Sequence, residues 1–151
     1  MPTITPFLWF DSQAEEAMNF YTAIFTRSRV ISVNRAQGRV MSVQFELEGQ
    51  AFMALNGGPL FKFTEAISFF VACETQQEID DLWGKLTADG GAPSRCGWLK
   101  DRFGLSWQIV PASLGRMLGD HDASRSKRVM DAMMQMDKLD LRRLQHAYDG
   151  A

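Results

Sequence analysis

The sequence predicts an α+β protein made of two βαβββ modules followed by a helical C-terminal extension. Two observations support this prediction. The order of strand-length apolar runs and amphipathic helical segments in the first half begins again in the second, and the chain from Ser113 onward shows only helical periodicity. We place module 1 at about residues 3–57, module 2 at about 64–112 and the extension at about 113–149, within one domain spanning residues 1–151.

The first module begins with a strand-length apolar run over residues 4–10. A helix is predicted to follow, because Ser12 and Glu15 have the spacing of a capping box and the apolar residues after them recur at helical spacing. Glycines at Gly38 and Gly49 can supply the positive φ of tight hairpin turns. The three strands separated by these turns are predicted over residues 30–33, 40–47 and 51–55.

The second module repeats this order. A strand over residues 67–73 precedes Thr75 and Glu78, which form a second capping box, and the helix after them ends near Gly90. The remaining strands are predicted as one or two short strands within residues 93–100 and a last strand over residues 105–110. Each half therefore reads as βαβββ.

Composition excludes several classes of protein. Sixteen Lys and Arg residues against eighteen Asp and Glu give a net charge of −2, which argues against a nucleic-acid partner. No apolar run approaches the roughly 20 residues of a membrane span, and the N-terminal residues do not resemble a secretory signal, so we expect a cytoplasmic protein with no membrane partner. The only cysteines, Cys73 and Cys96, are expected to be reduced thiols.

Several stretches together carry a family resemblance: residues 4–10 with 15–21, 52–59, 66–71 and 96–109. Over about residues 3–137 the chain resembles the PhnB-like branch of the vicinal-oxygen-chelate superfamily, which contains glyoxalase, bleomycin-resistance protein and extradiol dioxygenase. Members of this branch are often labelled 3-demethylubiquinone-9 3-methyltransferase. The resemblance implies paired βαβββ modules that curve around a shared hollow, and usually a homodimer.

Metal-dependent relatives in this superfamily hold a divalent ion with His, Glu or Gln side chains from four strands. The corresponding positions of this chain do not provide such a ligand set, and both histidines fall in the extension. We therefore expect no intrinsic metal and no cofactor. The four positions are Ile4, Phe52, Ser68 and Gln108, and the histidines are His121 and His146.

The hollow is expected to bind a small, planar or partly aromatic molecule through aromatic surfaces and a few amide or hydroxyl groups. The alternative for each lining residue is an ordinary core position with a satisfied polar group, and both interpretations stay open. The candidate ligand-binding residues are Phe52, Asn56, Ser68, Phe70, Trp98 and Gln108.

Whether the protein is an enzyme also stays open. Cys96 is the candidate nucleophile, since Lys100 nearby could favour a thiolate, but neither module contains a histidine to act as its base. An enzyme acting on a quinone-like or aromatic substrate is the first alternative, although the chain lacks the glycine-rich strand-to-helix turn typical of nucleotide-like methyl donors. The second alternative is an interaction protein without a ligand, which dimerises through its methionine-rich extension.

Overall fold

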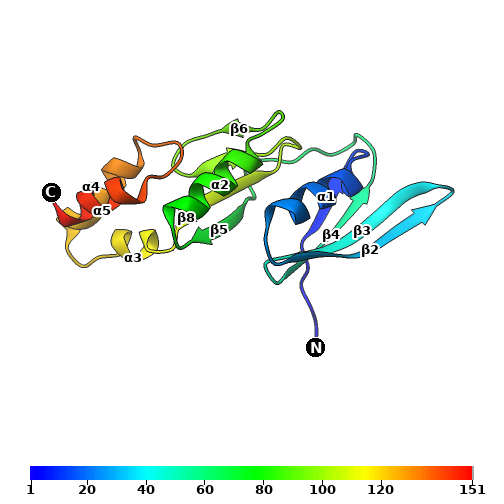
Figure 1. The fold of residues 1–151 in the computed structure, drawn as a ribbon, viewed down its shortest axis with the longest axis horizontal. Helices are drawn as coiled ribbons and strands as arrows, with labels where there is room; N and C mark the ends of the chain where they lie inside the picture. Colours follow the sequence, from blue (N-terminus) through cyan, green and yellow to red (C-terminus); the bar gives the residue numbers. More distant parts are fainter. Residues whose placement is uncertain (151) are drawn as a thin grey trace. The chain divides into compact units, whose positions relative to one another are not determined.

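The structure is a computed structural model that describes residues 1–150. The chain divides into two compact units, Met1–Phe63 and a second unit that begins at Thr64. Each unit contains one four-stranded sheet, and the element order confirms the prediction of two βαβββ modules followed by helices (Figure 1). Among residues 1–150, none of the helices has the length and apolar character of a membrane span.

Unit 1 has the strand order β1-β4-β3-β2, in which β1 runs parallel to β4 and the other pairs are antiparallel. The short hairpins that join β2 to β3 and β3 to β4 need positive φ, which Gly38 and Gly49 provide as predicted. The elements of this unit are β1 (Phe7–Phe10), α1 (Ala14–Ile24), β2 (Ser28–Ala36), β3 (Arg39–Leu47) and β4 (Gln50–Asn56).

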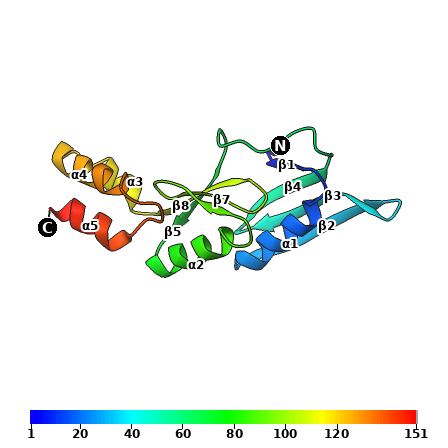
Figure 2. The same cartoon turned by 90° about the horizontal axis from the view of Figure 1, so that it is seen from above.

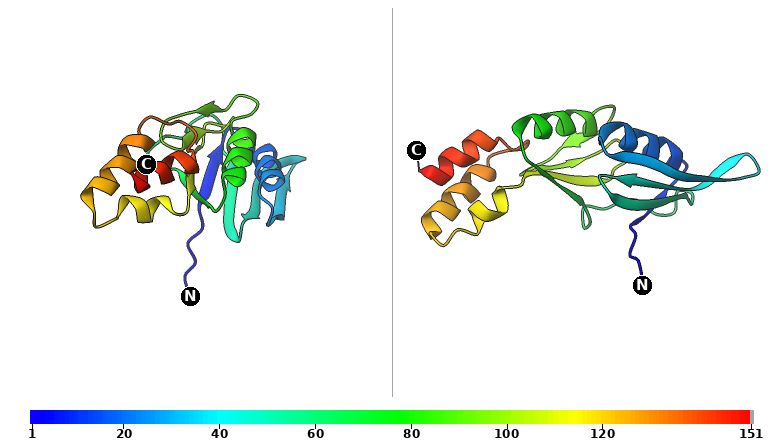
Figure 3. Two further views of the ribbon diagram at one scale, coloured as in Figure 1. Left: turned by 60° about the vertical axis from the view of Figure 1, so that its left-hand side comes forward. Right: turned by 60° about the horizontal axis from the view of Figure 1, so that its bottom comes forward.

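Helix α1 covers one face of the first sheet, as Figure 3 shows for the blue helix. Its buried stripe consists of residues at helical spacing, so a continuous apolar surface meets the alternate residues of β3 and β4. Tyr21 lies against Phe45 with ring centroids 6.3 Å apart, and Phe45 stacks on Phe52 at 5.5 Å. These aromatic contacts lie within the buried core of the unit.

The start of α1 corrects one prediction. The N-cap residue is Gln13, and no side chain of the predicted Ser12–Glu15 capping box caps the helix. The backbone N–H of Ala14 donates instead to the Asn56 side-chain oxygen at 2.8 Å. Asn56 lies opposite Phe10 because β4 pairs with β1. A residue distant in sequence therefore caps α1 in place of the local motif of Ser12 and Glu15.

Unit 2 repeats the strand order of unit 1, as β5-β8-β7-β6 with β5 parallel to β8. Helix α2 covers one face of this sheet, and the predicted capping box of Thr75 and Glu78 is confirmed at its start. The elements are β5 (Phe69–Cys73), α2 (Gln76–Leu86), β6 (Ala92–Pro93), β7 (Trp98–Lys100) and β8 (Ser106–Pro111).

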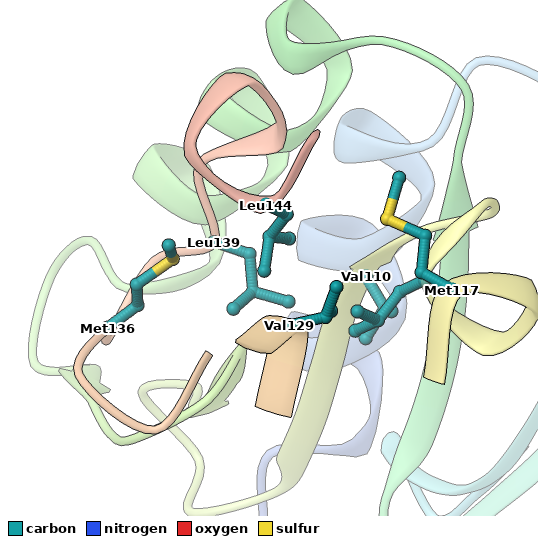
Figure 4. Packing of buried hydrophobic residues seen from close by; sticks show 7 residues of the cluster. Val110, Met117, Val129, Met136, Leu139 and Leu144 are labelled. Carbon is teal, nitrogen blue, oxygen red and sulfur yellow. The ribbon is translucent and has the colours of Figure 1, made fainter. Parts of the chain in front are cut away.

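The extension is helical, as predicted, and belongs to unit 2. Figure 2 shows its three helices grouped beyond the end of β8. They enclose an apolar cluster that includes Val110 from β8 and residues from every helix of the extension (Figure 4). The helices are α3 (Leu114–Leu118), α4 (Ala123–Met133) and α5 (Leu141–Asp149), and the buried cluster is Val110, Leu114, Met117, Val129, Met136, Leu139 and Leu144.

Polar contacts fasten the extension to the second module. The Gln76 side chain at the start of α2 donates to the Leu139 carbonyl at 3.0 Å and accepts from the Leu141 N–H at 2.7 Å. Lys138 pairs with Asp80 at 2.9 Å, and this contact lowers the pKa of the Asp80 carboxyl group. The extension therefore returns to α2 and does not trail away from the module.

Candidate functional site

The face of the second sheet opposite α2, which we call the open face, carries four of the predicted ligand-binding residues. Side chains alternate along a strand, and Leu99, Trp107 and Ile109 are buried on the α2 side. Their neighbours therefore point to the open face. Trp98 lies opposite Gln108 across β7 and β8, and Phe70 lies beside Gln108 across β5 and β8. Three predicted residues thus form one row across the sheet.

Ser68 joins this row through a hydrogen bond. The Gln108 side-chain amide donates to the Ser68 hydroxyl at 3.0 Å, which fixes the orientation of the amide group. This hydrogen bond uses the amide nitrogen, so the side-chain oxygen is the acceptor that Gln108 could offer to a ligand. The row therefore presents one oriented amide between two aromatic side chains.

The aromatic side chains differ in exposure. Phe70 is 59% exposed, and Trp98 is half-buried. A planar ligand could stack on either ring while its polar edge meets Gln108. The open face thus combines stacking surface with a single directional contact.

Ser106 is a residue of this face that sequence reasoning missed. It lies two positions before Gln108 on β8 and opposite Lys100 on β7, so alternation places it on the open face. Its hydroxyl is buried and has no hydrogen-bond partner within the described part of the chain, whereas the Lys100 ammonium is paired with Glu65. The two-residue spacing from Gln108 could have placed Ser106 on this face, but it gave no indication that the Ser106 hydroxyl would be buried.

Phe52 and Asn56, the two other candidate ligand-binding residues, contact groups of their own unit. Both belong to β4 of unit 1 and point toward α1. Phe52 is 6% exposed and stacks on Phe45, and Asn56 binds the start of α1 and the Val40 carbonyl. The apolar run in β4 gave no polar alternation, so the sequence could not show which side chains face the helix. Met53 and Leu55 occupy the opposite side.

The positions that correspond to metal ligands in relatives do not fit a metal. Ile4 and Phe52 offer no donor atom, and the Ser68 hydroxyl and Gln108 amide bind each other. No group of three His, Cys, Asp or Glu side chains within residues 1–150 could hold an ion. His121 and His146 lie in the extension, as their sequence positions required.

Cys96, the candidate nucleophile, lies just before β7 with its backbone in the left-handed region at φ 59°. Its thiol contacts the Met134 sulfur at 3.7 Å, and its N–H donates to the Met136 carbonyl at 2.8 Å. The thiol therefore contacts a thioether of the extension, which cannot serve as a general base. This environment gives no support to a nucleophilic role.

The two cysteines are expected to differ sharply in reactivity. Burial raises the pKa of the Cys73 thiol to about 11, and the carboxylates of Glu78 and Glu74 add to this shift, whereas Cys96 is partly exposed. Iodoacetamide at about pH 8 should therefore alkylate the folded protein once per chain, at Cys96. Mass spectrometry measures the count, and Cys96→Ser should abolish rapid labelling. Equal labelling of both thiols without denaturant would contradict the structure.

The repeated βαβββ module with one strand order gives the class of fold that the resemblance predicted, an α+β protein of paired modules. The profile of the 3-demethylubiquinone-9 3-methyltransferase family matches residues 2–110. Because this match covers most of the chain, the protein belongs to that family, whose members include PhnB-like proteins. A search against curated proteins found no match.

Solved structures support the assignment. A Bacillus cereus PhnB protein that carries the same methyltransferase description is 39% identical, with a TM-score of 0.67 over 72% of this chain and 99% of that one. A Pseudomonas aeruginosa protein shares the fold at 20% identity, with a TM-score of 0.58 over 74% of this chain and 98% of that one. The family match ends at residue 110, so α3, α4 and α5 lie beyond it.

Proposed function

We propose that this protein binds a small, planar and partly aromatic molecule on the open face of the second sheet, without a resident metal ion. The observation that supports this proposal is the Gln108–Ser68 hydrogen bond, which holds an amide between Phe70 and Trp98. Such a ligand would stack on the aromatic rings and donate a hydroxyl or N–H group to the Gln108 oxygen.

The proposal includes a homodimer in the cytoplasm. The family resemblance favours the dimer, and the two cysteines, which form no disulfide, are compatible with a reducing compartment. The ligand site proposed here uses residues of unit 2 alone.

Methyl transfer is not the function that the residues favour, although the Bacillus cereus relative is described as a methyltransferase. The paired glycines after β4 serve a different purpose from a nucleotide-binding turn. A Cβ at Gly57 would lie 2.4 Å from the Trp9 ring, and the Trp9 indole donates to the Gly58 carbonyl at 2.9 Å. These glycines make room for Trp9. An irregular segment and then β5 follow them, so they do not open a helix as the glycines of a nucleotide-binding turn do.

The test uses naphthol as the probe, since it combines a planar ring system with one hydroxyl. Titration monitored by NMR should shift the Trp98 indole resonance in a saturable manner. Gln108→Leu should weaken binding about fivefold through the lost hydrogen bond, and Trp98→Ala about tenfold through the lost stacking surface.

Phe61→Ala is the matched control, because Phe61 is an exposed aromatic residue of unit 1 and should leave the affinity unchanged. Binding that survives both variants of the open face, or no saturable binding of naphthol, would refute the proposal. The enzyme alternative has a separate readout: turnover of an aromatic substrate that Cys96→Ala abolishes without loss of binding would favour it.

A further inference from the structure

Two sulfur atoms are in contact on the surface of unit 2, where the loop before β7 meets the end of α4. The Cys96 thiol lies 3.7 Å from the Met134 thioether sulfur. Met134 is 49% exposed and Cys96 is partly exposed, so solutes can reach both. Cys73, the other thiol, is buried in β5.

A third sulfur donor lies one helical turn away. The Met134 N–H donates to the Met130 carbonyl at 3.0 Å, which shows that helical geometry continues from α4 through Met134. Met130 is therefore on the same helical face as Met134, and it is 42% exposed. Methionine side chains are flexible enough to turn their sulfur atoms toward a common point.

The backbone around these side chains is already held in place. Arg95 donates from its guanidinium to the Met134 carbonyl at 2.9 Å. The next two N–H groups of the loop, from Cys96 and Gly97, donate to the carbonyls of Met136 and Asp137 at 2.8 Å each. A Cβ at Gly97 would lie 2.9 Å from Leu139, so the loop and the extension are in close contact. The thiol and thioether are thus brought together by the fold before any ligand binds.

The sulfur separation suits a shared metal ion. An ion about 2.3 Å from each sulfur, as in typical metal–thiolate bonds, would join atoms 3.7 Å apart with a sulfur–metal–sulfur angle of about 107°. This angle lies close to the trigonal and tetrahedral values. Thiolate and thioether donors are soft, and a set of one thiolate with two thioethers selects Cu(I) over hard or borderline divalent cations.

We propose that Cys96, Met134 and Met130 form a binding site for one Cu(I) ion, separate from the ligand-binding open face. On binding, the Cys96 thiol releases its proton to solvent and its sulfur bonds to the ion, while the two thioethers donate without a change in protonation. No electron transfer is involved, because the ion enters as Cu(I). The site depends on the C-terminal extension, which supplies two of the three donors.

The test is an anaerobic titration of the purified full-length protein with Cu(I), in competition with the chromophoric chelator bicinchoninate. The wild-type protein should bind one equivalent of Cu(I) before the coloured bicinchoninate complex forms. Cys96→Ser should abolish this binding, and Met134→Leu should weaken it by at least about tenfold. X-ray absorption of the loaded protein should show sulfur neighbours only.

Two variants serve as controls. Cys73→Ser alters the buried thiol, and Met41→Leu alters an exposed methionine of unit 1; neither should change the titration. Circular dichroism checks that every variant is folded. The inference is overturned if the wild-type protein leaves all the Cu(I) with bicinchoninate, if folded Cys96→Ser retains the equivalent, or if nitrogen or oxygen atoms dominate the first coordination sphere.

Discussion

Replacing Asp101 with alanine is expected to destabilise the protein by about 3 kcal/mol. The Asp101 side chain is almost completely buried in the turn between β7 and β8, although its neighbours in sequence give the turn a polar appearance. One carboxylate oxygen accepts from the N–H groups of Phe103 and Leu105 at 2.9 and 3.0 Å, and the other accepts from the Trp107 indole at 2.9 Å. Alanine would leave these donors without their acceptor in a buried site.

Thermal unfolding measures the effect, which should appear as a melting temperature lower by roughly 6–12 °C for a chain of this length. Asp101→Asn should cost less, because the amide oxygen can still accept from the backbone while the amide nitrogen opposes the Trp107 indole. Asp131→Ala removes an exposed carboxylate that pairs with Lys127 and should change stability by less than about 0.5 kcal/mol. If Asp101→Ala matched this surface variant, the buried turn described here would be incorrect.

Leu144→Ala is expected to cost about 3 kcal/mol, since it opens a cavity at the centre of the extension. Leu144 is fully buried in α5 and belongs to the same cluster as Val110 of β8. Loss of this packing should therefore weaken the attachment of α5 to the module as well as α5 itself. Urea unfolding followed by tryptophan fluorescence reports the change, because Trp83, Trp98 and Trp107 all lie in unit 2.

Arg142→Ala provides the comparison within the same helix, as Arg142 is exposed and should have an effect below about 0.5 kcal/mol. Leu144→Ala with a similarly small effect would show that the extension contributes no packing energy to unit 2. Such a result would also remove the structural basis for placing Met134 beside Cys96.

The repeated module was predictable because its signals are local and occur twice. Apolar periodicity and turn glycines lie within short windows, and the Thr75 capping box needs only residues three positions apart. The Ser12 motif has the same spacing and failed, because Asn56 competes for the start of α1 from the other end of unit 1. A local motif therefore predicts a cap only where no distant group reaches the same donor.

The candidate site was predictable in part. Gln108 interrupts the apolar run of β8 and so reveals its alternation, strand register places Phe70 and Trp98 beside it, and a hydrogen bond joins it to Ser68. Phe52 lies in a continuous apolar run, so the sequence could not show which face of the sheet its side chain occupies. The contact between Cys96 and Met134 spans 38 residues and depends on how the extension packs, which no periodicity encodes.

The return of the extension to α2 bears on the order in which the protein can fold during synthesis. Every strand of unit 1 has emerged once Asn56 leaves the ribosome, so that unit can close early. The side chain of Gln76 must wait for Leu139 and Leu141, and Val110 stays uncovered until the last helices appear. During synthesis the N-terminal unit can therefore be folded while the C-terminal unit still exposes its apolar cluster. In that interval the exposed apolar surface favours aggregation, and chaperones can protect it.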